Sequence, residues 1–127
     1  MKPILKTLLV ILSISLVNCK KEDKSKLPSE ISTLEVTEIT ATTAVCSGEI
    51  DDYWKDLIVG ICWSTDPNII YDDIYNSYSV SQSQEKRFSC EMTNLIPNTK
   101  YYVRAYVANS YGTTKYGEQI EFTTLAD

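Results

Sequence analysis

Apolar and polar residues alternate along most of the chain after residue 30, and this period of two predicts short, half-buried strands. The clearest case follows the turn at Pro97-Asn98. There one face carries Tyr101, Val103, Ala105 and Val107, and the other carries Tyr102, Arg104, Tyr106 and Ala108. No stretch after residue 30 keeps the period of 3.6 residues that a helix requires, so an all-β domain is expected.

Gly, Pro, Asn and Asp separate seven expected strands. These strands cover about residues 33–37, 43–50, 57–64, 78–81, 86–93, 100–109 and 118–124. In the strands other than 100–109, the side chains expected to face inward are Leu34, Val36, Ala44, Cys46, Gly48, Ile50, Val59, Ile61, Trp63, Phe88, Cys90, Met92, Ile120 and Phe122. Seven short strands in about 100 residues favour a two-sheet β-sandwich.

Several motifs occur in the order found in a known family. The segment Leu95-x-Pro97-x-Thr99-x-Tyr101-x-Val103 resembles the E–F corner of fibronectin type III domains. A closer resemblance, to the fibronectin-III-like modules of bacterial surface lipoproteins, also includes Gly60-Ile61-Cys62-Trp63-Ser64, Asn109-Ser110-Tyr111-Gly112, Tyr116-Gly117 and Phe122-Thr123-Thr124. It implies a seven-stranded fibronectin type III/immunoglobulin-like sandwich over residues 31–127.

The same resemblance assigns a structural corner to Leu95, Pro97, Thr99 and Tyr101. The ring of Tyr101 is expected to be buried there, with its hydroxyl bonded to the backbone a few residues upstream. One departure is Gly48, which stands where animal modules usually carry a core tryptophan. Trp63 is expected to supply that bulk instead.

The first 18 residues are typical of a cleaved lipoprotein signal peptide. Positive charge on Lys2 and Lys6 precedes an apolar run from Leu8 to Val17, which is too short to cross a membrane as a helix. The segment ends with Leu16-Val17-Asn18-Cys19, which resembles a lipobox and implies lipid attachment at Cys19. A buried amphipathic helix and a free structural cysteine are the alternatives. Several acyl chains on Cys19 would anchor the protein to a membrane stably.

Residues 19–30 have no apolar periodicity and are expected to form a flexible, solvated tether after the lipidated cysteine. The order Lys20-Lys21-Glu22-Asp23 resembles the export tags of surface lipoproteins, which implies a surface-exposed position on the bacterial outer membrane; its periplasmic face is the alternative. From residue 31 onward, six basic residues stand against fourteen acidic ones. This balance argues against a nucleic-acid partner.

The sequence offers little catalytic chemistry. Histidine is absent, which removes the commonest general base and metal ligand, and no glycine-rich phosphate loop is present. We therefore expect a non-enzymatic protein without cofactor or metal. Cys46 and Cys90 face the same way on neighbouring strands, so they could form a disulfide or remain two buried thiols, whereas Cys62 is expected to be unpaired. The carboxylates that could hold calcium, although a solvated acidic loop is favoured, are Asp51, Asp52, Asp56, Asp66, Asp72 and Asp73.

Aromatic residues outside the expected core are the candidate binding groups, because such rings stack on sugars and anchor protein interfaces. The primary candidates are Tyr71, Tyr75, Tyr78, Asp66 and Asn68, and the secondary ones are Tyr53, Trp54, Tyr111 and Tyr116. Chain reversals place the secondary set at the tether end of the sandwich. The leading hypothesis is a module that binds an unknown glycan or envelope protein, and the alternative is a structural subunit or spacer that pairs through an exposed sheet edge.

Overall fold

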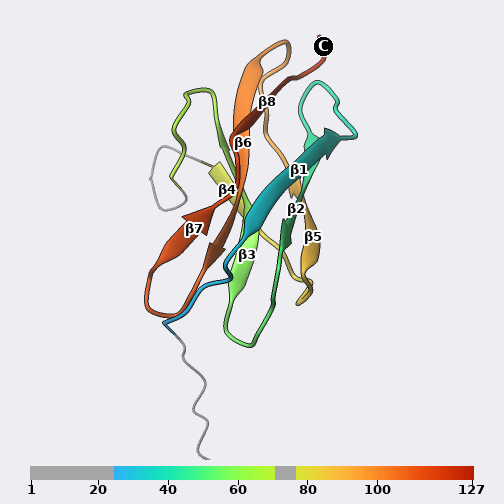
Figure 1. Cartoon of the computed structure of the whole chain (residues 1–127). Coiled ribbons are helices and arrows are strands. Elements are labelled where there is room, and N and C mark those ends of the chain that lie inside the picture. The colour runs from blue at the N-terminus through green and yellow to red at the C-terminus, as the bar shows by residue number, and fades with distance from the viewer. Residues whose placement is uncertain (1–24, 71–76) are drawn as a thin grey trace, which may run out of the picture.

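The computed structural model describes residues 25–70 and 77–127, which form two antiparallel sheets packed face to face (Figure 1). The strands are β1 (Ile31–Thr37), β2 (Ala44–Ile50), β3 (Ile58–Ser64), β4 (Ser77–Val80), β5 (Arg87–Met92), β6 (Lys100–Ala108), β7 (Thr114–Tyr116) and β8 (Ile120–Thr123). One sheet has the order β1-β2-β5. The other has the order β4-β3-β6, with β7 and β8 both on the free side of β6. The all-β sandwich expected from the sequence is confirmed. In the described part of the chain, no helix long and apolar enough to cross a membrane occurs.

The last expected strand, 118–124, is present as β8, and β7 just before it is an additional strand, so the described residues form eight strands instead of seven. β8 pairs with the first part of β6, Lys100–Val103, and β7 pairs with its last part, Tyr106–Ala108. Residues 117–119 therefore interrupt the ladder along this side of β6. At the interruption the Ala105 N–H donates to Thr33 Oγ1 at 2.9 Å instead of to a strand partner. A Cβ on Gly117 would lie 2.6 Å from that same oxygen. The close approach of β1 therefore explains both the break and the glycine.

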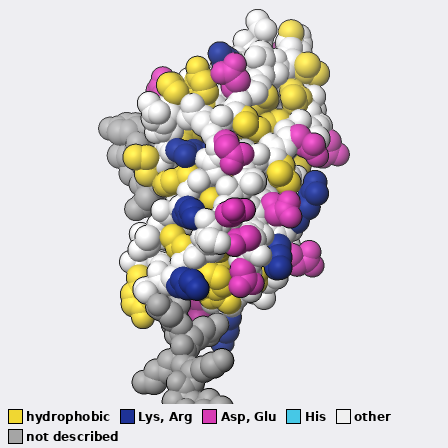
Figure 2. Space-filling view, viewed as in Figure 1, with side chains coloured by type: hydrophobic (Ala, Val, Ile, Leu, Met, Phe, Trp, Pro, Cys, Tyr) yellow, Lys and Arg dark blue, Asp and Glu magenta, His cyan; other side chains and the backbone are white. Residues whose placement is uncertain are grey.

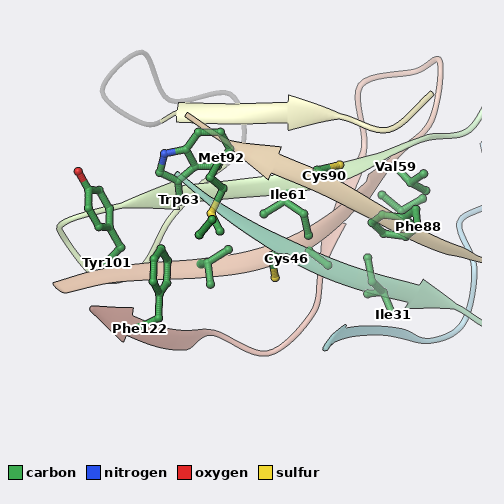
Figure 3. Packing of buried hydrophobic residues seen from close by; sticks show 14 of the residues in the cluster. Ile31, Cys46, Val59, Ile61, Trp63, Phe88, Cys90, Met92, Tyr101 and Phe122 are labelled. Atoms are coloured by element: carbon green, nitrogen blue, oxygen red, sulfur yellow. The ribbon is translucent and has the colours of Figure 1, made fainter. Parts of the chain in front are cut away.

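The core lies between the sheets and contains the alternating residues of β2, β3, β5 and β6 (Figure 3). The ring of Phe122 on β8 stacks against Tyr101, with centroids 5.8 Å apart. Trp63 is buried in the core, but it does not fill the space beside Gly48. A Cβ on Gly48 would meet the ring of Phe88 at 2.6 Å, so Phe88, its partner in the β2–β5 ladder, occupies that space.

The inward face of β1 differs from the expectation. Ile31 and Thr33 are buried, whereas Leu34 is only half-buried and does not belong to the core cluster. The register between β1 and β2 shifts between Thr33 and Val36, which turns Val36 back toward the core. A bulge of this kind changes the parity of a strand, and residue alternation alone does not reveal it.

Tyr106 is fully buried, although its place in the alternation puts it on the outer face of its sheet. The reason is a second, smaller cluster on that face, in which Ile69 covers Tyr106 and Cys62. The residues after β3 thus fold back over their own sheet. The alternation of apolar and polar residues does not predict a loop that covers the outer face, because it assumes that one face of each sheet is solvated.

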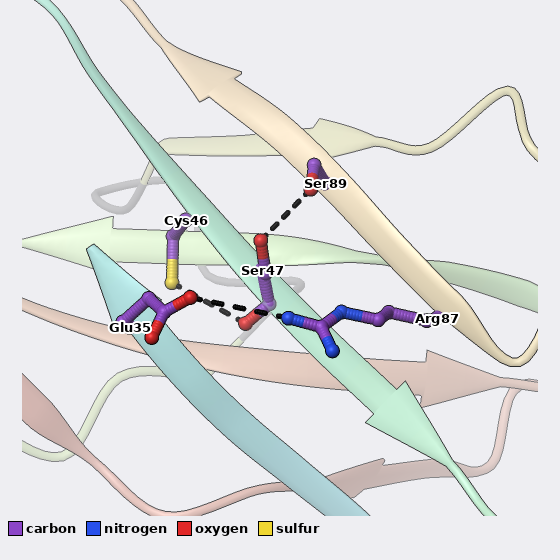
Figure 4. A network of polar contacts seen from close by, with 5 residues as sticks. All are labelled: Glu35, Cys46, Ser47, Arg87 and Ser89. Carbon is purple, nitrogen blue, oxygen red and sulfur yellow. Dashed lines mark hydrogen bonds and ion pairs between the residues drawn. The ribbon is translucent and has the colours of Figure 1, made fainter. Parts of the chain in front are cut away.

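The outer face of the three-stranded sheet is polar (Figure 4). The hydroxyls of Ser47 and Ser89 share a hydrogen bond of 2.8 Å between β2 and β5, and Arg87 reaches Glu35 on β1 at 3.9 Å. Both charged side chains are largely exposed, so this ion pair stabilises the sheet little. Figure 2 shows acidic side chains in a band down the face in view, flanked by lysine and arginine side chains. The mixed signs keep this face soluble without a strong field.

The three described cysteines are buried and free. Cys46 and Cys90 are direct partners in the β2–β5 ladder, but the disulfide considered for them is not formed. Burial raises the pKa of Cys46 and of Cys62 to about 12, and it also raises the pKa of Cys90. These thiols stay protonated at neutral pH and pack as small apolar groups.

Candidate functional site

The sandwich is open on the side where β4 and β5 lie across from each other. Among the described residues, β4 pairs only with β3 and β5 only with β2, so each is the edge of its sheet. Between them lies a pocket of about 650 Å³, and a second one of about 320 Å³ lies at the upper end of β4. We call this surface the β4–β5 groove. Its lining residues are Trp63, Ser77, Tyr78, Ser79, Val80, Ser81, Gln82, Ser83, Glu85, Arg87, Phe88, Ser89, Cys90, Glu91, Thr93 and Asn94.

The lower part of the groove is rich in hydrogen-bonding groups. Ser81 and Ser83 share a hydroxyl hydrogen bond of 3.0 Å, and the exposed carboxylates of Glu85 and Glu91 lie nearby. Here burial raises the pKa of Cys90, although a hydrogen bond with the Ser79 hydroxyl works in the opposite direction. The groove therefore offers donors and acceptors to a ligand, without an ionised thiol for nucleophilic catalysis.

The outer face of β4 and the adjoining part of β3 expose apolar side chains. Tyr78 is 52% exposed, Val80 is 39% exposed, and Ile58 on β3 is 40% exposed. Tyr78 and Val80 lie opposite Cys62 and Gly60 in the ladder, so both point to the outer face of the sheet. An edge strand with apolar side chains is a common docking surface, because a partner can bind both its backbone and its side chains.

The position of β4 depends on two residues of its own sheet, one on β3 and one on β6. A Cβ on Gly60 would lie 2.1 Å from Ser79 O, so only glycine lets β4 approach this closely. The hydroxyl of Tyr106 donates to Ser79 O at 3.3 Å. A buried tyrosine that spans the sheet therefore holds the exposed edge strand in place.

Arg104 fixes the loop that contains two of the predicted binding residues. Its guanidinium donates to Ile69 O at 3.3 Å and to Gly117 O at 3.1 and 3.2 Å, and it lies 4.5 Å from the ring centre of Tyr116. In addition, the Asn68 N–H donates to the Gln119 side chain at 2.7 Å. Asp66 and Asn68 are exposed on this loop, whereas Tyr116 is half-buried beneath Arg104. The arrangement gives Tyr116 a structural contact, a stacked cation–π pair.

The remaining candidates differ in their exposure. Tyr78 lies in the groove, whereas Tyr71 and Tyr75 fall outside the described residues. Tyr53 and Trp54 are half-buried against the core, and Tyr111 is 68% exposed at the tip of the β6–β7 turn. Of the secondary set, only Tyr111 is exposed, whereas Tyr53, Trp54 and Tyr116 are half-buried. The structure adds Val80 and the serines of the groove, which sequence reasoning missed. Alternation along 77–80 could have identified Val80 beside Tyr78.

The corner expected at residues 95–101 has the following geometry. Leu95 is buried, and the Ile96 N–H donates to the Tyr101 hydroxyl oxygen at 2.9 Å. The Thr99 hydroxyl donates to Pro97 O at 2.9 Å, and the Thr124 hydroxyl donates to Ile96 O at 2.6 Å. These bonds tie the corner to the end of β8. Elsewhere in the described ranges, no three Cys, Asp or Glu side chains converge on a point where a metal could bind.

Solved structures share this fold. The sensor domain of the anti-sigma factor RsgI4 in Pseudobacteroides cellulosolvens is 24% identical, with a TM-score of 0.56 over 76% of this chain and 75% of that chain. The fibronectin type III domain of human fibronectin type III domain containing protein 3 is 18% identical, with a TM-score of 0.57 over 84% and 94%. The sixth such domain from that human protein is 20% identical, with a TM-score of 0.54 over 81% and 91%. No protein-family model and no curated protein matches the sequence. The chain has a fibronectin type III-like fold.

Proposed function

We propose that this chain is a non-enzymatic lipoprotein of the bacterial outer membrane that binds a protein partner along the β4–β5 groove. The observation that carries the binding surface is the exposed apolar edge formed by Tyr78, Val80 and Ile58 beside a groove of about 650 Å³. The lipobox-like residues that end at Cys19 support the anchor. The RsgI4 domain to which the chain is similar is a sensor domain, which supports a role in binding or sensing.

A protein ligand fits this surface better than a glycan. Sugar rings stack on flat aromatic faces, and Tyr78 is the one exposed aromatic ring on this part of the described surface. Val80 and Ile58 instead offer branched apolar groups, which a sugar hydroxyl cannot satisfy but an apolar side chain can. Among the described residues, no further strand pairs with β4 or β5, so both edges also present backbone groups to which an extended peptide can bond.

Site-directed photo-crosslinking in cells tests the protein partner. A benzophenone amino acid replaces Tyr78 in one variant. In a matched control it replaces Tyr111, which lies at the β6–β7 turn, outside the groove. We expect one dominant crosslinked protein from position 78, lost when Val80→Asp is added, and none from position 111. Equal crosslinking from both positions contradicts the assignment. A glycan-array signal that disappears in Tyr78→Ala would instead establish the glycan as the ligand.

The second candidate is a structural subunit that pairs with a copy of itself through β4. Its support is the position of β4 at the edge of its sheet in the described part of the chain, since an edge strand is a template for another strand. Sedimentation of the purified protein distinguishes the two. Concentration-dependent oligomers that vanish in Tyr78→Lys favour self-pairing, and a monomer at all concentrations leaves the binding module as the function.

A further inference from the structure

Residues 25–30, expected to be part of the solvated tether, are instead fixed to one end of the sandwich. The Asn109 side chain donates to Ser25 O at 2.8 Å, and Lys115 donates to the carbonyls of Pro28 and Ser29. Pro28 is buried, and Leu27 packs against the core. The expectation of a free tether over residues 19–30 is therefore wrong for its second half, which we call the docked arm.

Asp51 holds the docked arm from the neighbouring loop. It accepts hydrogen bonds from the Ser29 hydroxyl and, at 2.9 Å, from the Glu30 N–H. The Asp51 N–H in turn donates to Glu30 O at 3.2 Å. Three elements thus hold the arm: the loop before β3, the β6–β7 turn and β7. Alternation could not reveal this, because the contacts are polar and join segments 21 to 87 residues apart.

We propose that the docked arm holds the sandwich upright on a lipid surface, with the β6–β7 turn toward the lipid and the E–F corner away from it. This rests on the proposed lipid anchor at Cys19. In Figure 1 the arm, drawn in blue, lies at the lower end of the sandwich and the C-terminus at the upper end.

Docking shortens the tether below the length of the domain. Six Cα steps from Cys19 to Ser25 span at most about 22 Å, whereas twelve steps to Ile31 would span about 43 Å. The nine residues of β6 alone extend about 30 Å, at about 3.3 Å each. An inverted domain, with its corner on the lipid, would hold the arm farther from the membrane than the tether reaches. A free tether would allow that inversion, and the docked arm forbids it.

The chemistry of this end also suits a lipid surface. Tyr111 is 68% exposed at the tip of the β6–β7 turn, and the half-buried Trp54 lies on the loop before β3. Tyrosine and tryptophan favour the membrane–water interface. This end is less acidic than the rest of the domain, because Lys26, Lys55 and Lys115 stand against Glu30, Glu49, Asp51, Asp52 and Asp56. The rest of the domain is strongly acidic, so this end is repelled least by anionic headgroups.

Energy transfer to the membrane tests this orientation. The lipidated protein is placed in phosphatidylethanolamine–phosphatidylglycerol vesicles that carry acceptor dyes on their headgroups. A donor dye is attached to Tyr111→Cys in one variant and to Ile96→Cys, at the E–F corner, in another. Both positions are exposed, and the native thiols of Cys46 and Cys62, with pKa values of about 12, do not compete for the dye. A matched pair carries ten Gly/Ser residues inserted between Asp23 and Lys24.

In the chain of native length we expect strong energy transfer from position 111 and weak transfer from position 96. In the chain with the insertion, the ratio of the transfer from position 111 to that from position 96 should be near one. Equal transfer from both positions of the native-length chain, with the protein still floating with the vesicles, overturns the upright orientation and leaves the anchor intact. A native chain that fails to float, as Cys19→Ala is expected to fail, overturns the anchor and the orientation together.

Discussion

Replacing Tyr101 with phenylalanine removes a single hydroxyl from the E–F corner and measures what the corner contributes. Tyr101 is 6% exposed, its ring stacks on Phe122, and its oxygen accepts the Ile96 N–H at 2.9 Å. Phenylalanine keeps the ring and its packing, so the loss is one hydrogen bond, about 1 kcal/mol. The Ile96 side chain is 58% exposed, so water can reach this part of the backbone. The cost therefore stays near that value instead of approaching about 3 kcal/mol for a sealed donor.

Urea unfolding of the mature chain measures this loss, which corresponds to a fall in Tm of about 4–8 °C for a domain of about 100 residues. The urea dependence of the unfolding free energy should not change, because the buried area is the same. Hydrogen exchange gives a second readout, since the Ile96 amide should lose its protection. Tyr111→Phe is the matched control, because its ring is exposed. An unchanged stability in Tyr101→Phe, or an equal loss in Tyr111→Phe, would refute the role of the corner.

Gly60→Ala places a Cβ 2.1 Å from Ser79 O, so we expect a loss of about 3 kcal/mol and faster amide exchange in β4. Because the pKa of the Cys62 thiol is raised to about 12 in the folded protein, the unfolded chain loses this proton at lower pH than the folded one. The free energy of unfolding should therefore fall between about pH 9 and 12, by about 1.4 kcal/mol per pH unit for each buried thiol. This fall should be smaller in Cys62→Ala. The Ser29 hydroxyl, more than the Glu30 N–H, lowers the pKa of Asp51. Docking of the arm should therefore persist above about pH 4 and weaken as the pH falls through the lowered pKa of Asp51. Faster hydrogen exchange of the arm amides at low pH would report this weakening, and Asp51→Ala should remove the pH dependence.

The alternation of residues predicted the sandwich because most strands bury one face. It placed Ala44, Cys46 and Ile50 on the inner face of β2, and all three are buried. It failed at Leu34 and Tyr106 for two different reasons. A bulge in β1 changes the parity at Leu34, and a loop that returns over its own sheet buries Tyr106. Both failures arise from contacts between segments distant in sequence, which a local period does not encode.

The candidate site was less predictable than the fold. Tyr78 stood out as an aromatic residue in an irregular region, but the groove beside it exists only because β5 lies across from β4. Ser79 and Cys90 meet there from strands that pair with different neighbours. No spacing in the sequence brings these two residues together. What a sequence can indicate is a candidate side chain, whereas the shape around it depends on the packing of the sheets.

The docked arm and the β4–β5 groove together limit how a partner can approach. β4 runs along the side of the sandwich, from the end with the corner toward the end with the arm. In a domain held upright by a tether of about 22 Å, this side faces sideways, parallel to the membrane surface. A second protein anchored in the same membrane meets such an edge at a fixed height, which raises its effective concentration over that of a free ligand. Lengthening the tether should therefore weaken capture of a membrane-anchored partner by position 78, and leave capture of a free one unchanged.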